Sequence, residues 1–438
     1  MDFLQLHPIV GRSVTSSVAL SLVLLGSTVS FAANLKDNEH TISLREAVAK
    51  TIQFNPELRT FDFQLKAQDG RVQQAKLAPS PELNIAFDDT LGTGDYKGLD
   101  KTQTTISIAW LLERGVRQYY IESAQAKSSL LTVDADIKQL DAAAETARRY
   151  IVSLAYQSRM TNSKKTVQLA KETIIEVEKR VRAGKTPDAE LFRAKAELAR
   201  RELEREDIEH ELESANRLLA AQWGEIAPDF TQVEGDIISL PEVTSFATLK
   251  SRLQQSPEFT RLLSDKRLKQ SVLALERAKV KSDWRVSAGA RHFKSGNDLA
   301  FVAGISIPFG ERTRNTGRIA EVQANLDKAN SEEIATRVRI ETALFVLYEK
   351  LQHSLHVLDI LRNRIIPPLE QALTETRRAY TLGRYSYLEW KSVQAELLDA
   401  QNALIEASIN VHQNMIEIER LTGVRIAQSA NKLIPEAP

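Results

Sequence analysis

The sequence predicts a mainly α-helical protein with a small β part, built from two copies of one unit. Residues 43–225 and 245–424 share a pattern at an offset of 199 to 201 residues. The matching anchors are Asn55-Pro56-Glu57-Leu58 with Ser256-Pro257-Glu258-Phe259, Ile106-Ser107-Ile108 with Ile305-Ser306-Ile307, Gly184 with Gly383, and Ala196-Glu197-Leu198 with Ala395-Glu396-Leu397. Because only 17 Gly and 13 Pro occur in 438 residues, long uninterrupted elements are expected.

The first 32 residues predict a signal peptide for export. Arg12 precedes the apolar run Val18-Ala19-Leu20-Ser21-Leu22-Val23-Leu24-Leu25, and Ser30-Phe31-Ala32 forms a small-residue cleavage site. The alternative is a short membrane anchor, but the run is far below the roughly 20 apolar residues that span a bilayer. We therefore expect residues 1–32 to be the signal and 33–42 to be an N-terminal extension.

Composition excludes several classes of function. The 58 Lys and Arg balance the 58 Asp and Glu, so no overall positive field attracts nucleic acid. The chain has no Cys, which excludes a disulfide framework, a thiolate metal site and a lipid anchor on an N-terminal Cys of the mature chain. No later segment has the pattern of a membrane-spanning helix.

Each copy is expected to contain a short helix, a medium helix, two strands, a very long helix, a Gly-marked turn and another long helix. In the first copy these elements fall near residues 43–54, 56–78, 82–90, 102–110, 114–182 and 188–223. In the second they fall near 244–256, 258–280, 284–293, 299–308, 313–382 and 386–422. Residues 226–244 are expected to be a linker and residues 425–438 a C-terminal tail.

The strands show the two-residue alternation of a sheet with one apolar face. The residues of that face are Leu83, Ile85, Phe87, Ile106, Ile108, Trp110, Trp284, Val286, Ala288, Phe301, Ala303, Ile305 and Ile307. Strands of about ten residues with this pattern have the length and alternation of strands in a transmembrane barrel. The alternative is a pair of soluble hairpins on a small core. Four strands cannot close a barrel alone, so the membrane interpretation requires several chains.

The helix after each Gly turn carries a heptad pattern typical of a coiled-coil seam. The seam positions are Leu191, Ala194, Leu198, Arg201, Arg205, Ile208, Leu212, Ala215 and Leu219, then Trp390, Val393, Leu397, Ala400, Leu404, Ala407, Val411, Asn414 and Ile418. A soluble antiparallel bundle would share this seam. The helix over 114–182 would be roughly 100 Å long, so we expect the shorter helices to stack end to end beside it.

The chain resembles the TolC-like outer-membrane factor family over residues 43 to 424. The segments that carry the resemblance are Leu44-Arg45-Glu46-Ala47, Asn55-Pro56-Glu57-Leu58, Gln73-Gln74-Ala75, Pro79-Ser80-Pro81-Glu82-Leu83, Tyr380-Thr381-Leu382-Gly383-Arg384-Tyr385-Ser386-Tyr387-Leu388-Glu389 and Glu419-Arg420-Leu421-Thr422-Gly423. Two of them, Pro-Ser-Pro-Glu-Leu and Leu-Gly-Arg-Tyr-Ser-Tyr-Leu-Glu, look most like the branch that serves heavy-metal resistance-nodulation-division pumps.

The resemblance implies a homotrimer in the outer membrane of a Gram-negative bacterium. Three sets of four strands would form one twelve-stranded barrel in outer-membrane lipid, continued by an α-helical tunnel in the periplasm. A periplasmic adaptor (membrane fusion protein) and an inner-membrane pump are the implied partners. Because the chain has no GxxxxGK[ST] loop, it would be a passive conduit with no cofactor.

The resemblance assigns adaptor contact to the two turns, at Gly184, Lys185, Thr186, Gly383, Arg384 and Ser386. Glycine permits the left-handed backbone that reverses a helix, and Thr186 or Ser386 can cap the helix that follows. The alternative is that these residues form capped turns and nothing more.

Two features occur in the second copy alone and suggest a gate. Glu389 matches the first acidic position of the family's aperture, whereas the second position is Ser392; three copies of Glu389 would attract cations. A solvated surface glutamate is the alternative. Pro367-Pro368 should bend or break the long helix near Ile366, and we expect this kink to let the second hairpin lean inward.

The leading hypothesis is therefore an exit duct of a tripartite efflux system for heavy-metal cations. The alternatives are a duct for drugs or type I protein secretion, and a soluble periplasmic coiled-coil scaffold. No nucleophile, base and orienting group form a recognisable set, so an enzyme is not expected. His353 and His356 lack a carboxylate partner at a suitable spacing, so no metal site is expected.

Overall fold

The computed structural model describes residues 40–113, 115–240, 242–281, 283–308 and 315–423. The expected signal peptide (1–32) and C-terminal tail (425–438) lie outside the described residues, as does most of the extension 33–42. The helices are α1 Leu44–Phe54, α2 Pro56–Lys76, α3 Val116–Arg182, α4 Asp188–Ala220, α5 Phe246–Arg252, α6 Pro257–Ala278, α7 Thr316–Ile360, α8 Ile366–Thr381 and α9 Tyr387–Thr422. The strands are β1 Thr41–Ile42, β2 Glu82–Asp88, β3 Gln103–Leu112, β4 Gln232–Val233, β5 Trp284–Phe293 and β6 Asp298–Ser306.

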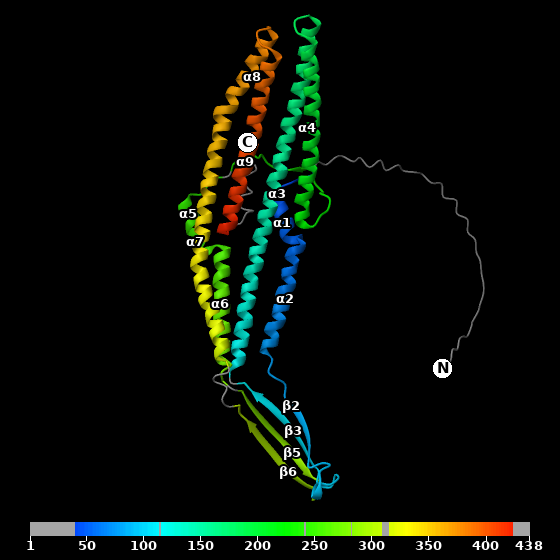
Figure 1. The fold of residues 1–438 in the computed structure, drawn as a ribbon, viewed down its shortest axis with the longest axis vertical. Helices are drawn as coiled ribbons and strands as arrows, with labels where there is room; N and C mark the ends of the chain where they lie inside the picture. The colour runs from blue at the N-terminus through cyan, green and yellow to red at the C-terminus, as the bar shows by residue number, and fades with distance from the viewer. Residues whose placement is uncertain (1–39, 114, 241, 282, 309–314, 424–438) are drawn as a thin grey trace, which may run out of the picture. The chain divides into compact units, whose positions relative to one another are not determined.

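Successive lengths of α3 are covered by different helices. In Figure 1, α4, α1 and α2 lie one after another beside it, and α6 and α9 also pack against it. This is the end-to-end stacking expected from the helix lengths. In the second copy α6 and α9 cover successive lengths of α7 in the same way.

The very long helix expected over 313–382 is divided in the structure. α7 ends at Ile360, a π-helical turn covers Leu361–Ile365, and α8 carries Pro367 and Pro368 in its first turn. Proline has no backbone N–H and its ring clashes with the preceding turn, so the regular α-helical pairing cannot continue through this point. By contrast, α3 runs for 67 residues without interruption.

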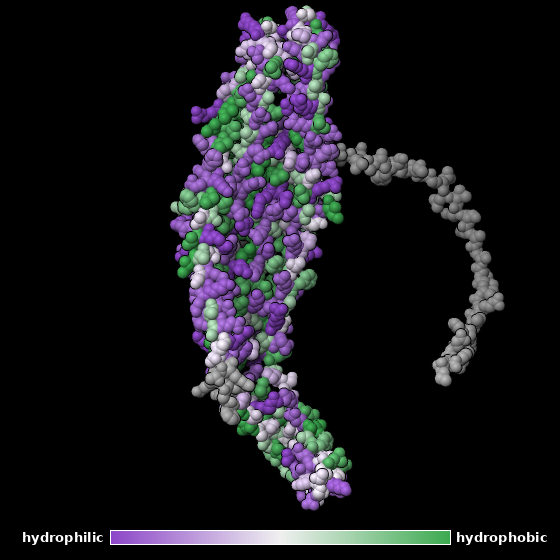
Figure 2. Space-filling view, in the orientation of Figure 1, coloured by the Kyte–Doolittle hydropathy of each residue, from purple (hydrophilic) through white to green (hydrophobic). Residues whose placement is uncertain are grey.

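The sheet has the strand order β2-β3-β5-β6 and is antiparallel throughout. Ile85 pairs with Ile106, Ile106 with Ala290, and Ala290 with Phe301, so the apolar positions of all four strands share one face. Its exposed large side chains are Leu83, Ile85, Phe87, Ile106, Ile108, Trp110, Leu112, Trp284, Leu299, Phe301 and Ile305. The predicted alternation is confirmed, and hydrophobic residues gather on the sheet in Figure 2. β6 ends at Ser306, so Ile307 follows the strand.

The other face of the sheet is small and polar, with ion pairs near both ends. Glu82 pairs with Arg285, and Asp88 lies 3.7 Å from Arg291. Among the described parts of the chain, no helix has both the length and the apolar character needed to cross a membrane.

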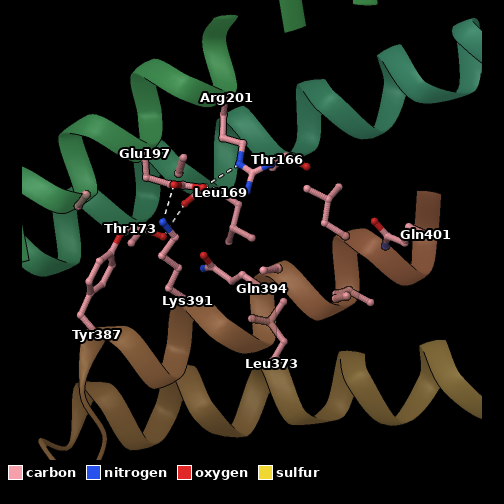
Figure 3. A pocket seen from close by; sticks show the side chains of 15 residues that line it. Thr166, Leu169, Thr173, Glu197, Arg201, Leu373, Tyr387, Lys391, Gln394 and Gln401 are labelled. Atoms are coloured by element: carbon pink, nitrogen blue, oxygen red, sulfur yellow. Dashed lines mark hydrogen bonds and ion pairs between the residues drawn. The ribbon is translucent and has the colours of Figure 1, made fainter. Parts of the chain in front are cut away.

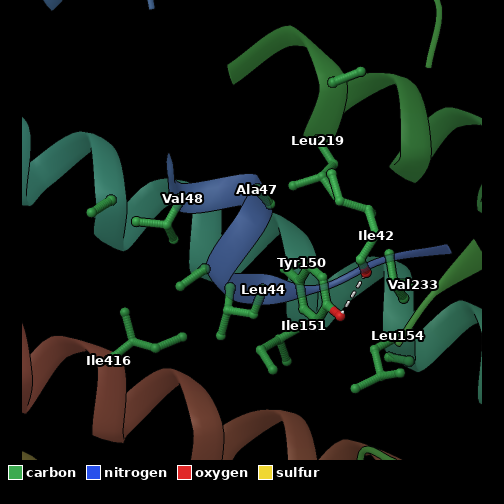
Figure 4. Close-up of a cluster of buried hydrophobic side chains, with 14 of the residues drawn as sticks. Ile42, Leu44, Ala47, Val48, Tyr150, Ile151, Leu154, Leu219, Val233 and Ile416 are labelled. Atoms are coloured by element: carbon green, nitrogen blue, oxygen red, sulfur yellow. Dashed lines mark hydrogen bonds between the residues drawn. The ribbon is translucent and has the colours of Figure 1, made fainter. Parts of the chain in front are cut away.

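The largest hydrophobic core joins α1, the middle of α3, the linker and α9 (Figure 4). Tyr150 of α3 is buried at its centre, and its hydroxyl lies within hydrogen-bonding distance of the carbonyl oxygens of Ile42, at 3.1 Å, and of Glu234. Burial raises the pKa of Tyr150, so the phenol stays protonated and can donate.

The linker is fixed to helices of both copies. Gln157 of α3 makes two 3.1 Å hydrogen bonds with the backbone of Val233, one to its N–H and one to its carbonyl. His412 of α9 is buried, and its Nε2 lies 3.0 Å from the carbonyl oxygen of Ile237. Because a carbonyl only accepts, this nitrogen carries the proton. The linker therefore holds α3 and α9 together.

The buried His412 makes stability depend on pH. Burial lowers its pKa below 6.5, so its contribution to stability is complete above pH 6.5 and is lost as the pH falls below that value. We expect the melting temperature of the wild type to fall more on acidification than that of His412→Gln, which keeps an N–H donor but does not titrate. The exposed His210 provides the control, because His210→Gln should retain the wild-type pH dependence. Identical pH dependence in all three proteins would contradict the assignment.

Candidate functional site at the paired hairpin turns

The turns at Gly184 and Gly383 have the same backbone structure. Both glycines have positive φ, 68° and 76°. In the first turn the N–H of Lys185 bonds the carbonyl of Arg180, and in the second the N–H of Arg384 bonds the carbonyl of Ala379. These are Schellman caps, in which a glycine ends the helix and satisfies its last carbonyls.

The helices after the turns begin differently. Ser386 caps α9: its Oγ accepts from the N–H of Glu389, whose carboxylate accepts from the N–H of Ser386 at 2.6 Å and from its hydroxyl at 2.8 Å. Thr186 does not cap α4, contrary to the expectation. Pro187 occupies the N-cap position, and the Thr186 hydroxyl instead lies 3.2 Å from the Glu190 carboxylate.

Arg180 joins the two turns. Its guanidinium donates to the carbonyls of Tyr380 and Thr381, the second at 3.1 Å, and lies 4.7 Å from the centre of the Tyr380 ring. The Tyr380 hydroxyl lies 3.3 Å from the Glu190 carboxylate. Burial and the charge of Glu190 raise the pKa of Tyr380 to about 12, so this hydroxyl remains a donor. The turns are therefore held side by side.

A small hydrophobic core lies just behind the turns. Tyr380 and Trp390 are 1% exposed each, and their ring centres are 5.1 Å apart. Val177, Ala194 and Tyr387 complete the buried cluster, which draws residues from α3, α4, α8 and α9. Both hairpins contribute, so the cluster fixes the lateral position of one against the other.

An ion cluster centred on the buried Glu197 connects α4 to α9 further from the turns (Figure 3). Glu197 accepts from Lys391 at 2.6 Å, and it pairs with Arg201 at 2.8 Å and Arg200 at 3.0 Å. Burial raises the pKa of Glu197, but the hydrogen bond from Lys391 and the charge of Arg201 outweigh burial, and the net pKa is lowered. The cluster borders a cavity of about 60 Å³ in which the amide nitrogen of Gln394 has no partner in the structure.

Sequence reasoning missed Glu197 and Lys391 as a pair. The available signal was Arg201, an arginine at a seam position that the heptad pattern places toward the interior. A buried arginine requires a carboxylate nearby. Its partner Glu197 lies one turn earlier on the same helix, but Lys391 is 194 residues away in the chain.

The structure places the remaining candidates as follows. Glu389 is exposed, and its hydrogen bonds from Ser386 lower its pKa. Pro367 and Pro368 follow the π-helical turn. Among the residues that the structure describes, which include His353 and His356, no three His, Cys, Asp or Glu residues form a group that could hold a metal ion.

Comparisons with known proteins agree on the type of chain. Residues 47–225 match the model of a family described as outer membrane efflux protein. The chain is 26% identical over 394 residues to the cobalt-zinc-cadmium resistance protein CzcC of Cupriavidus metallidurans, covering 87% of this chain and 90% of that one. It is 25% identical to the nickel and cobalt resistance protein CnrC of the same organism, covering 62% and 66%.

Solved structures share the fold. CusC superposes with a TM-score of 0.72 at 15% identity, covering 87% of this chain and 92% of that one. The outer membrane protein VceC of Vibrio cholerae gives 0.70 at 18%, covering 87% and 96%.

The Glu197 cluster should matter more for stability than an exposed pair. Lys391→Met keeps the length of the side chain but leaves the buried carboxylate with one cation fewer, at a cost of about 1–2 kcal/mol. Lys171→Met is the control, because Lys171 and Glu202 are 3.6 Å apart and 51% and 46% exposed; its loss should stay below about 0.5 kcal/mol. Urea unfolding followed by tryptophan fluorescence measures both. Equal losses of unfolding free energy in the two variants would refute the claim that the Glu197–Lys391 pair stabilises the fold more than an exposed pair does.

Proposed function

We propose that the chain, whose residues 47–225 match the outer membrane efflux protein family, forms the outer-membrane channel of a tripartite efflux system, a passive exit duct for heavy-metal cations. The single observation that carries the proposal is the similarity to CzcC across nearly the whole of both chains. CzcC is named for resistance to cobalt, zinc and cadmium, and CnrC for resistance to nickel and cobalt, and both names support metal cations as the cargo.

The sheet supports a site in the outer membrane. One face presents large apolar side chains to the surroundings, and the other is small and polar. A face of the first kind suits lipid, and one of the second kind suits a water-filled channel. Since four strands cannot close a barrel, we propose that three chains combine into one of twelve strands. The helical hairpins would then line a periplasmic tunnel.

The paired turns are the proposed contact with a periplasmic adaptor, which would link the duct to an inner-membrane pump of the resistance-nodulation-division type. The exposed turn residues Gly184, Lys185, Gly383, Arg384 and Ser386 support this role, and Thr186 is half-buried beside them. The pump would supply the energy for transport, and the chain would form the channel through which the cargo leaves.

We propose Glu389 as a ring of negative charge at the aperture. Its lowered pKa keeps it ionised at mildly acidic pH, and its capping bonds hold its carboxylate at the start of α9. The π-helical turn before Pro367 would allow α8 to bend relative to α7. The π-helical turn has no counterpart in the uninterrupted α3, which supports the second copy as the moving one. Contrary to the expectation, Glu389 has a counterpart in the first copy, because the offset of 199 residues aligns it with Glu190.

The cargo can be tested in a deletion strain. The strain should become sensitive to zinc, cobalt, cadmium or nickel but not to dyes and antibiotics, and the intact gene should restore resistance. Sensitivity to dyes alone would replace the metal assignment with a drug duct. Recovery of the protein in the soluble periplasmic fraction, without heat-resistant trimers, would instead favour the scaffold.

The proposed gate can be tested in planar bilayers. Glu389→Gln should reduce the preference for cations, read from the reversal potential in a salt gradient, because each trimer loses three charges. Pro367→Ala with Pro368→Ala should reduce the open fraction, because the continuous helix resists bending. Ser386→Ala is the control, since it removes the cap but keeps the charge. Unchanged selectivity would remove Glu389 from the mechanism, and unchanged gating would remove the two prolines.

A further inference from the structure

The two hairpin turns share one backbone but present different side chains. The offset of 199 residues that relates Gly184 to Gly383 aligns Lys185 with Arg384. The remaining aligned pairs are Ala183 with Leu382, Thr186 with Tyr385, Asp188 with Tyr387 and Ala189 with Leu388. Because the caps are the same, these pairs occupy equivalent places in the two turns. At three of these pairs, Ala183 with Leu382, Thr186 with Tyr385 and Ala189 with Leu388, the second turn has a large exposed apolar side chain in place of a smaller residue.

A cation is the feature that both turns keep. Lys185 and Arg384 are exposed, and within the described part of the chain neither side chain has an ion pair or hydrogen bond. Two other cations near the turns are paired: Arg182 with Glu178 at 2.8 Å, and Lys391 with Glu197 at 2.6 Å. An unpaired cation held at a fixed place in a turn is available to a negatively charged partner.

Glu389 lies five residues after Arg384 but forms no ion pair with it in the structure. Glu389 is turned back onto the N–H and hydroxyl of Ser386. The first turn, by contrast, has exposed Asp188 close to Lys185, and the aligned residue in the second turn is the buried Tyr387. The second turn therefore has an aromatic residue where the first turn has the carboxylate of Asp188, while Glu389 aligns with Glu190 of the first turn.

Large apolar side chains surround Arg384 and have no equivalent in the first turn. Leu382, Tyr385 and Leu388 are 60%, 47% and 64% exposed. We name these three residues and Arg384 the second-turn patch. In the first hairpin the large exposed apolar residues nearest the turn are Phe192 and Ile175, eight and nine residues from Gly184. Three exposed apolar residues within seven positions form a patch of the kind that marks a protein interaction site.

We propose that the second-turn patch is the principal docking surface for a partner protein that presents an apolar side chain flanked by carboxylates, while Lys185 of the first turn adds charge attraction alone. This inference rests on the proposed function, in which the turns meet an adaptor. Apolar contact would supply most of the affinity, and the two cations would set orientation and the rate of association. An anionic lipid surface is disfavoured, because Asp188 and Glu389 lie beside the cations.

The probes are helical-hairpin peptides on one scaffold that differ only at the tip. One carries leucine with two glutamates, the second leucine with two lysines, and the third serine with two glutamates. Binding to the purified full-length protein in detergent is measured at low and high salt. The variants are L382A/Y385T/L388A, which gives the second turn the residues of the first, the reciprocal A183L/T186Y/A189L, and the charge reversals R384E and K185E. F192A is the matched control.

We expect the leucine–glutamate peptide to bind best. L382A/Y385T/L388A should weaken it at least about tenfold at both salt concentrations, because the lost contact is apolar. R384E should weaken it and improve binding of the leucine–lysine peptide. K185E should have a smaller effect that disappears in high salt. A183L/T186Y/A189L should strengthen binding, and F192A should leave it unchanged.

Four outcomes would overturn the inference: equal binding of the leucine–lysine peptide, equal binding of the serine–glutamate peptide, binding to phosphatidylglycerol vesicles in place of the peptides, or pairing of the proteins with each other through these residues. Ion conductance in planar bilayers separates this inference from the proposed function. A protein that conducts but does not discriminate between peptides refutes the docking surface alone, whereas a wild type that does not conduct refutes the channel.

Discussion

A very long helix must have its apolar positions covered along its whole length, and the rest of the structure follows from how this requirement is met. α3 has 67 residues, with buried positions from Val116 to Val177. No other helix is as long, so α4, α1 and α2 cover it in succession, and α6 and α9 close it from the second copy. A lone helix of this composition would expose those positions to water.

Polar contacts join the two copies at several levels along α3 and α9. The linker fixes the middle through Tyr150, Gln157 and His412. The Glu197 cluster and the Arg180 contacts follow toward the turns. Each level uses a buried or partly buried polar group. Leaving such a group without a hydrogen bond costs more free energy than forming the bond contributes. Such groups fix the register of helices whose apolar contacts alone would tolerate sliding.

Local features of this chain could be predicted from the sequence, and long-range pairs could not. The strand faces follow from two-residue alternation, and the Gly184 and Gly383 turns follow from the need for positive φ. The π-helical turn could be anticipated only as a break near Pro367. The prediction that Thr186 caps α4 was wrong. The helix begins one residue later than that prediction requires, so Pro187 occupies the N-cap position. Lys391 was missed because no local pattern identifies a partner 194 residues away.

The matched caps at Gly184 and Gly383 have a consequence for symmetry. In the proposed trimer, the six turns would have a common backbone but two alternating sets of side chains. Such an end is close to six-fold symmetric in shape and only three-fold symmetric in chemistry. A ring of six identical partner subunits placed on it would occupy two inequivalent environments in alternation, so identical subunits would acquire two different affinities from the duct alone.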